Sequence, residues 1–273
     1  MKQTHLIIVL ISIFALPVLA QNLTDSNVNG LPTGEEIAAH INSRDEGKAV
    51  SRKLKIEMRD RRGKIRQRET MSYRKYFAKE KRTVIFYLAP KNIKDTAFLT
   101  YDYNDPDLAD DQWLYLPALR KVRRISASDR GDYFLGTDMT YEDIKLETRV
   151  STADFNFQTI GTCNAKGKPG LKIEGIPKTQ EIARELGYSK TQSCVDNEIW
   201  MVRTSQFWDI KDNLLKTVTI NDIEKIQGIW TQKNIEVENH KTGHSTGLTF
   251  SEVDYRSSVA DGIFNTNAMK RGL

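Results

Sequence analysis

The stretch that decides the fold is KLKIEMR, residues 53–59, in which apolar and charged side chains alternate. In an extended chain Leu54, Ile56 and Met58 fall on one side, and the charged residues between them fall on the other. A period of two is typical of a strand with one buried face and one face in water. The sequence therefore predicts a half-buried β-strand here.

The residues that follow continue this pattern. Arg62 and Gly63 predict a turn, and residues 65–77 predict a second strand. On this strand Met71, Tyr73 and Phe77 share one side, and Arg66, Arg68 and Arg74 share the other. Further strands are predicted at 83–89, 97–103, 112–116, 121–125, 198–205, 214–222, 229–237 and 247–255.

Short turns between these segments favour an antiparallel meander of about nine or ten strands, because parallel strands need long crossover connections. A sheet of that size is expected to curl and leave a concave face, which helices from elsewhere in the chain can fill. The predicted fold class is mainly β (α+β). The residues alone do not say which face of each strand points inward.

Four regions depart from the strand pattern. Thr33 and Glu36 have the spacing of a capping box at the start of a short amphipathic helix. Residues 126–147 are rich in turns and partly helical, and 161–196 read as a long excursion from the sheet with a helix at 179–186. Residues 259–273 are expected to close over one end.

The N-terminus has the three parts of a signal peptide at residues 1–20: a positive Lys2, an apolar run, and Val18-Leu19-Ala20, which places small residues at the cleavage positions. An uncleaved anchor is the alternative, but the apolar run is shorter than the roughly 20 residues that cross a bilayer. The residue directly after Ala20 is not a cysteine, so there is no lipid attachment point at the cleavage site. We therefore expect a non-lipidated periplasmic protein with a flexible leader at 21–32 and a single domain at 33–273.

The chain has two cysteines, Cys163 and Cys194. In an oxidising compartment such a pair usually forms a disulfide. A redox couple normally has the Cys-x-x-Cys spacing, and zinc needs further ligands, so a structural disulfide is the preferred interpretation.

The sequence does not contain a complete catalytic or cofactor motif. His240 and His244 have a spacing that suits metal ligands on a helix, but they flank a predicted hairpin turn and lack a third ligand nearby. The sequence has no Gly-x-Ser-x-Gly elbow of a serine hydrolase. Aspartates between Asp102 and Asp111 favour a solvated turn, with a calcium site as the alternative. We expect no enzyme activity, no metal and no cofactor.

Residues 52–75 are rich in lysine and arginine. Their alternation with apolar residues favours the water-facing side of a strand pair. The functional alternative is contact with anionic headgroups or an acidic partner protein. A nucleic-acid partner is not expected for a secreted chain whose net charge is only +5.

The most specific stretch is WLYLPALRKVRRIS, residues 113–126, followed by YFLGTDMTYEDI, residues 133–144. These segments resemble the periplasmic outer membrane lipoprotein-sorting protein family, which is similar to the LolA and LolB carriers and to RseB-type sensors. The resemblance extends from about residue 33 to the C-terminus. The region 161–194 is more elaborate than in the commoner pattern of the family and carries both cysteines.

The resemblance implies a half-open, curled antiparallel β-barrel whose helices cover the concave face. It implies a cavity for a hydrophobic ligand such as a lipid or acyl chain, and transient membrane contact. It also implies a membrane partner, either an inner-membrane exporter of the resistance-nodulation-division type or an outer-membrane acceptor. No catalytic residue or cofactor comes with the family.

A carrier of apolar cargo needs a dry concave surface lined by apolar side chains. Eight residues are predicted to line it, with ordinary core packing as the alternative for each. They are Phe86, Leu88, Trp113, Tyr115, Tyr133, Phe134, Trp208 and Trp230. The predicted function is a periplasmic carrier, and the alternative is a sensor or adaptor that binds a protein partner without transporting cargo.

Overall fold

The computed structural model describes residues 28, 30–105 and 108–273. The predicted signal peptide at 1–20 lies outside the described residues, as does most of the predicted leader at 21–32. Within the described ranges, no helix has the length and apolar character that crossing a membrane requires.

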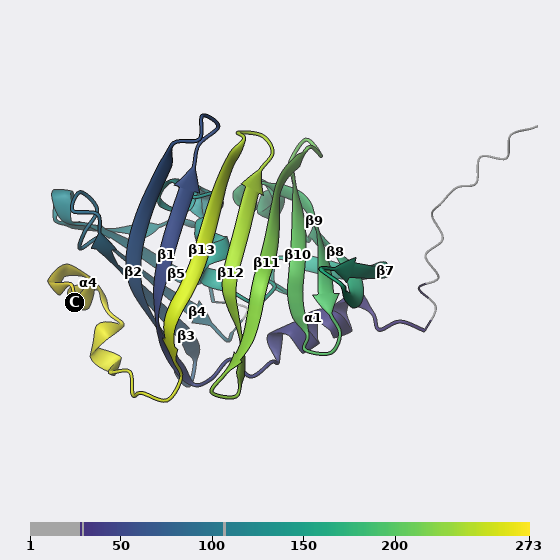
Figure 1. Cartoon of the computed structure of the whole chain (residues 1–273), viewed down its shortest axis with the longest axis horizontal. Coiled ribbons are helices and arrows are strands. Elements are labelled where there is room, and N and C mark those ends of the chain that lie inside the picture. The colour runs from purple at the N-terminus through teal and green to yellow at the C-terminus, as the bar shows by residue number, and fades with distance from the viewer. Residues whose placement is uncertain (1–27, 29, 106–107) are drawn as a thin grey trace, which may run out of the picture.

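In the described part of the chain, thirteen strands form one sheet in which all neighbouring strands are antiparallel (Figure 1). The first six are β1 (Ala49–Arg59), β2 (Ile65–Tyr76), β3 (Glu80–Ala89), β4 (Ala97–Tyr103), β5 (Asp111–Leu116) and β6 (Lys121–Ile125). The other seven are β7 (Phe155–Ala165), β8 (Lys168–Pro177), β9 (Tyr188–Asp196), β10 (Met201–Asp209), β11 (Leu214–Ile226), β12 (Ile229–Asn239) and β13 (His244–Asp254). The expected antiparallel, mainly β fold is confirmed.

The order of the strands explains why a segment must cross the sheet. The order is β6-β5-β4-β3-β2-β1-β13-β12-β11-β10-β9-β8-β7, so two meanders join where β1 pairs with β13. Strands β6 and β7 follow each other in sequence but form opposite edges of the sheet. The connection between them, residues 126–154, therefore has to run from one edge to the other. We call these residues the cover.

The helices among the described residues are few and short. They are α1 (Gly34–Asn42), α2 (Tyr141–Leu146), α3 (Gln180–Leu186) and α4 (Thr266–Arg271), with 3-10 turns at Pro117–Leu119, Ala127–Asp129, Phe134–Gly136 and Asp261–Ile263. The capping box predicted at Thr33 and Glu36 is present in α1. The cover contains α2, and Figure 1 shows its teal helices behind the curled sheet.

The sheet has apolar cores on both faces. On the inner face, side chains from both meanders, such as Ile56, Tyr87 and Val237, pack with Phe134 and Tyr141 of the cover. On the outer face of β3–β5, Phe86 and its neighbours pack under the C-terminal segment, which contributes Val259, Phe264 and Met269. Strand β3 is buried on both faces for this reason. Residues 259–273 thus cover an outer face and do not close one end as expected.

The region 161–196 is the main correction to the sequence analysis. It is not an excursion, because it contains the end of β7 and all of β8 and β9, which are full members of the sheet, and only the predicted helix, α3, leaves the sheet. These strands raise the total from the expected nine or ten to thirteen. The predicted disulfide is confirmed: Cys163 on β7 is bonded to Cys194 on β9, across the intervening strand β8.

Candidate functional site

The cover packs on the inner face of the sheet through aromatic rings. Phe134 and Tyr141 lie with their ring centroids 4.9 Å and 5.5 Å from that of Phe98 on β4. Burial of aromatic rings contributes most of the stabilisation in such contacts. The cover is therefore held by apolar packing at the β3–β5 side of the concave face.

Buried polar contacts fix the cover to the other meander. The Asp138 carboxylate accepts hydrogen bonds from Thr246 on β13 at 2.7 Å and from Asn239 on β12 at 3.1 Å. Asp143, on α2, forms an ion pair with Lys216 on β11. Because a buried polar group needs a hydrogen-bond partner, these contacts fix the cover in one position on the sheet.

Among the pockets lined by cover residues, two share part of their walls. The shared lining comes from Met139, Asp143, Glu147 and Thr148 of the cover and from Gln232 of β12. One pocket, about 130 Å³ in volume, lies toward β9–β11 and is mainly apolar. We call it the apolar pocket. Its apolar lining includes Leu146, Phe155, Leu186, Val202, Phe207 and Val218.

The second pocket, about 60 Å³, lies toward β1, β2 and β13. Arg44, Arg52 and Arg74 line it together with Glu46 and Glu147. We call it the arginine pocket. Its remaining walls are largely apolar and include Leu54, Ile85, Ile144, Ile235, Leu248 and Phe250. Cationic groups and an apolar surface thus face the same small space.

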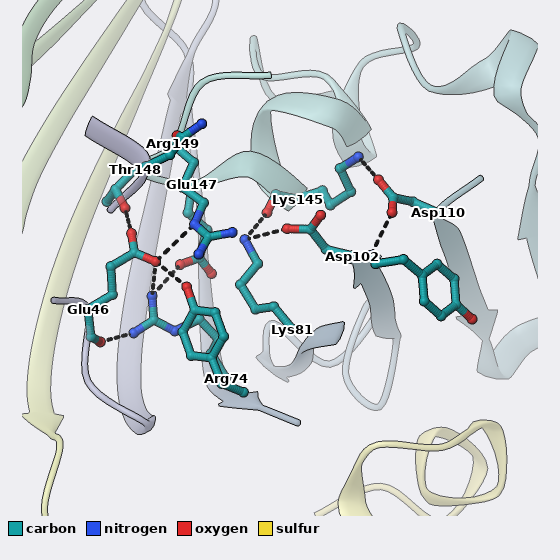
Figure 2. A network of polar contacts seen from close by, with 12 residues as sticks. Glu46, Arg74, Lys81, Asp102, Asp110, Lys145, Glu147, Thr148 and Arg149 are labelled. Atoms are coloured by element: carbon teal, nitrogen blue, oxygen red, sulfur yellow. Dashed lines mark hydrogen bonds and ion pairs between the residues drawn. The ribbon is translucent and has the colours of Figure 1, made fainter. Parts of the chain in front are cut away.

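The arginine pocket belongs to a larger polar network, shown in Figure 2. Glu46, in the loop before β1, bridges Arg74 of β2 and Arg149 of the cover, at 3.4 Å from each. Further along, Lys81 of β3 pairs with Asp102 of β4 at 2.9 Å and donates to the carbonyl oxygen of Lys145. The network connects the first meander to the cover, and Lys216 connects the second meander to it.

The arginines correct one interpretation of the sequence. The strand pair 52–75 was expected to present its basic residues to water, but the Arg74 side chain is only 4% exposed, and Arg52 forms a 2.7 Å ion pair with Glu147. The apolar side of this segment instead faces outward, where Tyr73 of β2 and Phe77, just after it, pack on the cluster under the C-terminal segment. The alternation of side chains along β2 was correctly predicted, but the prediction that its basic side faces water was wrong. Lys53 and Lys55, on β1, are exposed as expected.

Electrostatics in the network follow from its burial. Burial by itself raises the pKa of the Glu46 carboxyl, but Arg74, Lys81 and two hydroxyl hydrogen bonds lower it to about 2. The pKa of Arg44 is lowered, because burial and the neighbouring Arg74 and Arg149 outweigh the attraction of Glu46. The pKa of Arg74 is raised instead, because the attraction of Glu147 and Glu46 outweighs the opposing effect of its burial.

The eight predicted lining residues are spread over the molecule. Phe86, Trp113 and Tyr115 pack on the outer face under the C-terminal segment, away from both pockets. Phe134 is buried in the inner core, and Trp230, 38% exposed, lines the arginine pocket. Their role as ligand contacts stays a prediction.

The remaining three lie at or near the surface. Tyr133 is 41% exposed and accepts a hydrogen bond from Asn239 at 2.9 Å. Trp208 lies beside Lys190, and Leu88 is half-buried. The apolar pocket is lined by other residues, including Phe207 and Val218, which the aromatic criterion and the unknown strand parity did not single out.

The aspartates and histidines that were considered as metal ligands lie in ordinary structural positions. Asp102 is paired with Lys81, and Asp110 with Lys145. His240 and His244 flank the hairpin turn between β12 and β13, as the sequence predicts. Within the described ranges, no group of three or more histidine, cysteine, aspartate or glutamate side chains has an arrangement that would hold a metal ion.

A family model described as an uncharacterized protein matches residues 79–271, which is most of the chain. A solved DUF1329 family protein from Desulfovibrio piger is 26% identical, with a TM-score of 0.79 over 86% of this chain and 97% of that one. A domain from Vibrio parahaemolyticus, classed with the outer membrane lipoprotein-sorting proteins, is 27% identical, with a TM-score of 0.79 over 87% and 98%.

The chain belongs to the LolA-like family. A LolA superfamily protein from Nitrosomonas europaea is 18% identical, with a TM-score of 0.65 over 87% of this chain and 99% of that one, and this likeness is one of fold. No curated protein matches the chain. The LolA-like fold accounts for the half-open sheet and for the cover on its concave face.

Proposed function

We propose that this LolA-like protein is a periplasmic carrier that holds an apolar ligand, such as the acyl chain of a lipid or lipoprotein, between the sheet and the cover. The observation that carries the proposal is the apolar pocket, which Phe155, Phe207, Val218 and other apolar side chains line on the concave face. The lipoprotein-sorting name of the Vibrio parahaemolyticus relative supports the same function.

Binding on this proposal needs no covalent step and no cofactor. Each methylene removed from water contributes about 0.8 kcal/mol. A cavity of about 150 Å³ holds a ligand of the size of benzene, and ligand pockets usually enclose about 300–1,000 Å³. The apolar pocket, at about 130 Å³, is smaller than an acyl chain requires. The structure therefore represents a closed form, and loading requires the cover to move away from the sheet.

The proposal includes the route of the protein and its partners. Residues 1–20 direct export and are removed, and residues 33–273 act as one binding domain. Ligand is exchanged during transient contact with a membrane partner, which is an inner-membrane exporter of the resistance-nodulation-division type or an outer-membrane acceptor. The protein acts by binding and not as an enzyme.

Native mass spectrometry of the protein purified from the periplasm, followed by organic extraction, tests the carrier function. We expect an added mass that extracts as lipid. If the protein is purified without ligand, uptake of a fluorescent fatty acid is measured next. A protein that carries no extractable mass and takes up no probe would overturn the proposal.

A blocking variant locates the site. Val218→Trp fills the apolar pocket from β11 and is expected to reduce probe uptake at least tenfold. Thr219→Trp places the same indole on the neighbouring residue, whose side chain points to the opposite face of the strand, and is the matched control. Equal uptake by both variants would place the ligand elsewhere on the protein.

A further inference from the structure

The arginine pocket has the chemistry of an amphipathic site. Arg44, Arg52 and Arg74 line one part of it, and Leu248 and Phe250 belong to the apolar part. Such a combination is unnecessary for a purely apolar ligand, because burying a cation costs free energy unless the cation is paired. The arginines therefore need a reason beyond packing.

Charge is not balanced around this pocket. Four arginines, Arg44, Arg52, Arg74 and Arg149, surround two glutamates, Glu46 and Glu147. The other acidic residue in the lining, Asp143, is already neutralised by Lys216. The four arginines thus share two carboxylates, which leaves an excess of two positive charges in a largely buried place.

The arginines also keep unused hydrogen-bonding capacity. The side chain of Arg44 is 8% exposed and that of Arg74 is 4% exposed, and the Nε atom of each has no hydrogen-bond partner among the described residues. Their nearest carboxylate oxygens lie at 3.4–3.7 Å. Charge-assisted hydrogen bonds are usually about 2.7–2.9 Å long, so these pairs are loose. A further anion can be accommodated.

We infer that the ligand carries an anionic oxygen head group, a carboxylate or a phosphate, which binds to Arg44, Arg52 and Arg74 while the apolar tail extends beneath the cover into the apolar pocket. The inference rests on the proposed carrier function and names its ligand class. Because the two pockets share the wall formed by Met139 and Glu147, one amphipathic molecule reaches both once the cover moves.

The geometry favours a small head group. The arginine pocket has a volume of only about 60 Å³, which limits the group that enters it. Planar guanidinium groups match the oxygens of carboxylate and phosphate and form bidentate hydrogen bonds with them. The head group would neutralise the excess positive charge, and its burial would strengthen the interaction relative to water.

Equilibrium binding of four probes tests the inference: hexadecanoate, hexadecyl phosphate, hexadecanol and methyl hexadecanoate, which share a C16 alkyl or acyl chain and differ in head group. The purified protein is expected to bind at least one anionic probe ten times or more tightly than both neutral probes. The two anionic probes distinguish a carboxylate ligand from a phosphate ligand. Equal affinity for all four probes would overturn the head-group inference and leave the carrier function standing, whereas no binding of any probe would overturn the carrier function itself.

Variants tie the preference to the pocket. Arg44→Gln is expected to reduce the affinity for the anionic probe at least tenfold and to leave the affinity for hexadecanol within about twofold. Lys55→Gln removes one positive charge from the exposed outer side of β1 and is the matched control. If Arg44→Gln does not fold, Arg52→Gln replaces it in the same pocket. A variant that loses affinity for charged and neutral probes alike would contradict a head-group contact.

Discussion

Lys216 on β11 and Asp143 on α2 form an ion pair in the interior of the protein, where the Lys216 side chain is fully buried. The ammonium group lies 5.1 Å from the ring centroid of Tyr188 and 4.8 Å from that of Phe207. It also donates to the carbonyl oxygen of Asp138, in the cover, at 3.3 Å. The pair therefore connects the cover to the strands that line the apolar pocket.

Replacing Lys216 by methionine is expected to lower the free energy of unfolding by about 3–5 kcal/mol, because it leaves Asp143 with an uncompensated charge. Urea denaturation followed by circular dichroism measures the change. Lys233→Met breaks a partly exposed pair with Glu224 and is the control, with an expected change within about 1 kcal/mol. Similar losses in both variants would mean that the buried pair does not hold the cover.

The lowered pKa of Glu46 predicts how the stability of the folded protein changes at acid pH. The pKa of Glu46 is about 2 in the folded protein and about 4.5 without the fold. A depressed carboxyl pKa stabilises the folded state above pH 4.5, and this contribution, about 3 kcal/mol, is lost as the pH falls from 4.5 toward 2. Glu46→Gln is therefore expected to be less stable at neutral pH and to lose less stability over this pH range.

Urea titrations at pH 6, 4.5 and 3 measure the acid dependence. Glu57→Gln removes a carboxylate of the same kind from the outer side of β1, so it accounts for the change in net charge. If Glu46→Gln and the native protein lose equal stability between pH 4.5 and 3, then Glu46 is not the group that the arginines hold ionised.

Much of the sheet could be predicted because burial on one face leaves a period of two in the sequence. Leu54, Ile56 and Met58 show this pattern and are all buried. The inward face of β2 could not be predicted, because both of its faces are covered. Tyr73 packs under the C-terminal segment, while Arg74 is compensated by Glu46, a partner 28 residues away that no local pattern reveals.

The pockets were beyond prediction for a related reason. They depend on how β6 and β7 separate to opposite edges, which sends the cover across the sheet, and this follows from the pairing of β1 with β13 far apart in sequence. Their lining mixes aliphatic, aromatic and polar residues, so an aromatic criterion includes Trp230 but misses Val218. Because the parity of β10 was unknown, the prediction contained Trp208 and not its neighbour Phe207, whose side chain lies on the other face of the strand.

The surroundings of Gly170, next to the disulfide, leave no space for a side chain. Gly170 lies on β8 opposite Cys163, and an added Cβ atom would be 2.3 Å from the carbonyl oxygen of Val195 and 3.3 Å from Sγ of Cys163. Gly170→Ala therefore has to shift the backbone of β9 and is expected to cost about 1–3 kcal/mol. Gly247→Ala, on β13, is the control, because the nearest atom to its Cβ is 4.0 Å away. Equal thermal midpoints for the two variants would show that β8 and β9 are less closely packed than described.

Because the sheet has two apolar cores, we predict that a substitution in the outer core changes stability and that a substitution in the apolar pocket changes ligand binding. Phe264 is fully buried on the outer face, where its ring lies edge-on to Phe77 with centroids 5.7 Å apart. Phe264→Ala is expected to cost about 3–5 kcal/mol of stability and to leave probe affinity within about twofold at a temperature where the variant is folded. Phe207→Ala, in the lining of the apolar pocket, is expected to weaken binding at least tenfold.

Thermal denaturation and fluorescent fatty-acid titration of the same samples give the two quantities for each variant. Because Phe264 packs on the face of the sheet that lies away from the cover, its loss can change affinity only through a general loosening of the sheet, which the unfolding midpoint reports. A strong loss of binding by folded Phe264→Ala, with Phe207→Ala unaffected, would place the ligand between the C-terminal segment and the outer face. In that case Phe86, Trp113 and Tyr115, and not the residues beneath the cover, would be its contacts.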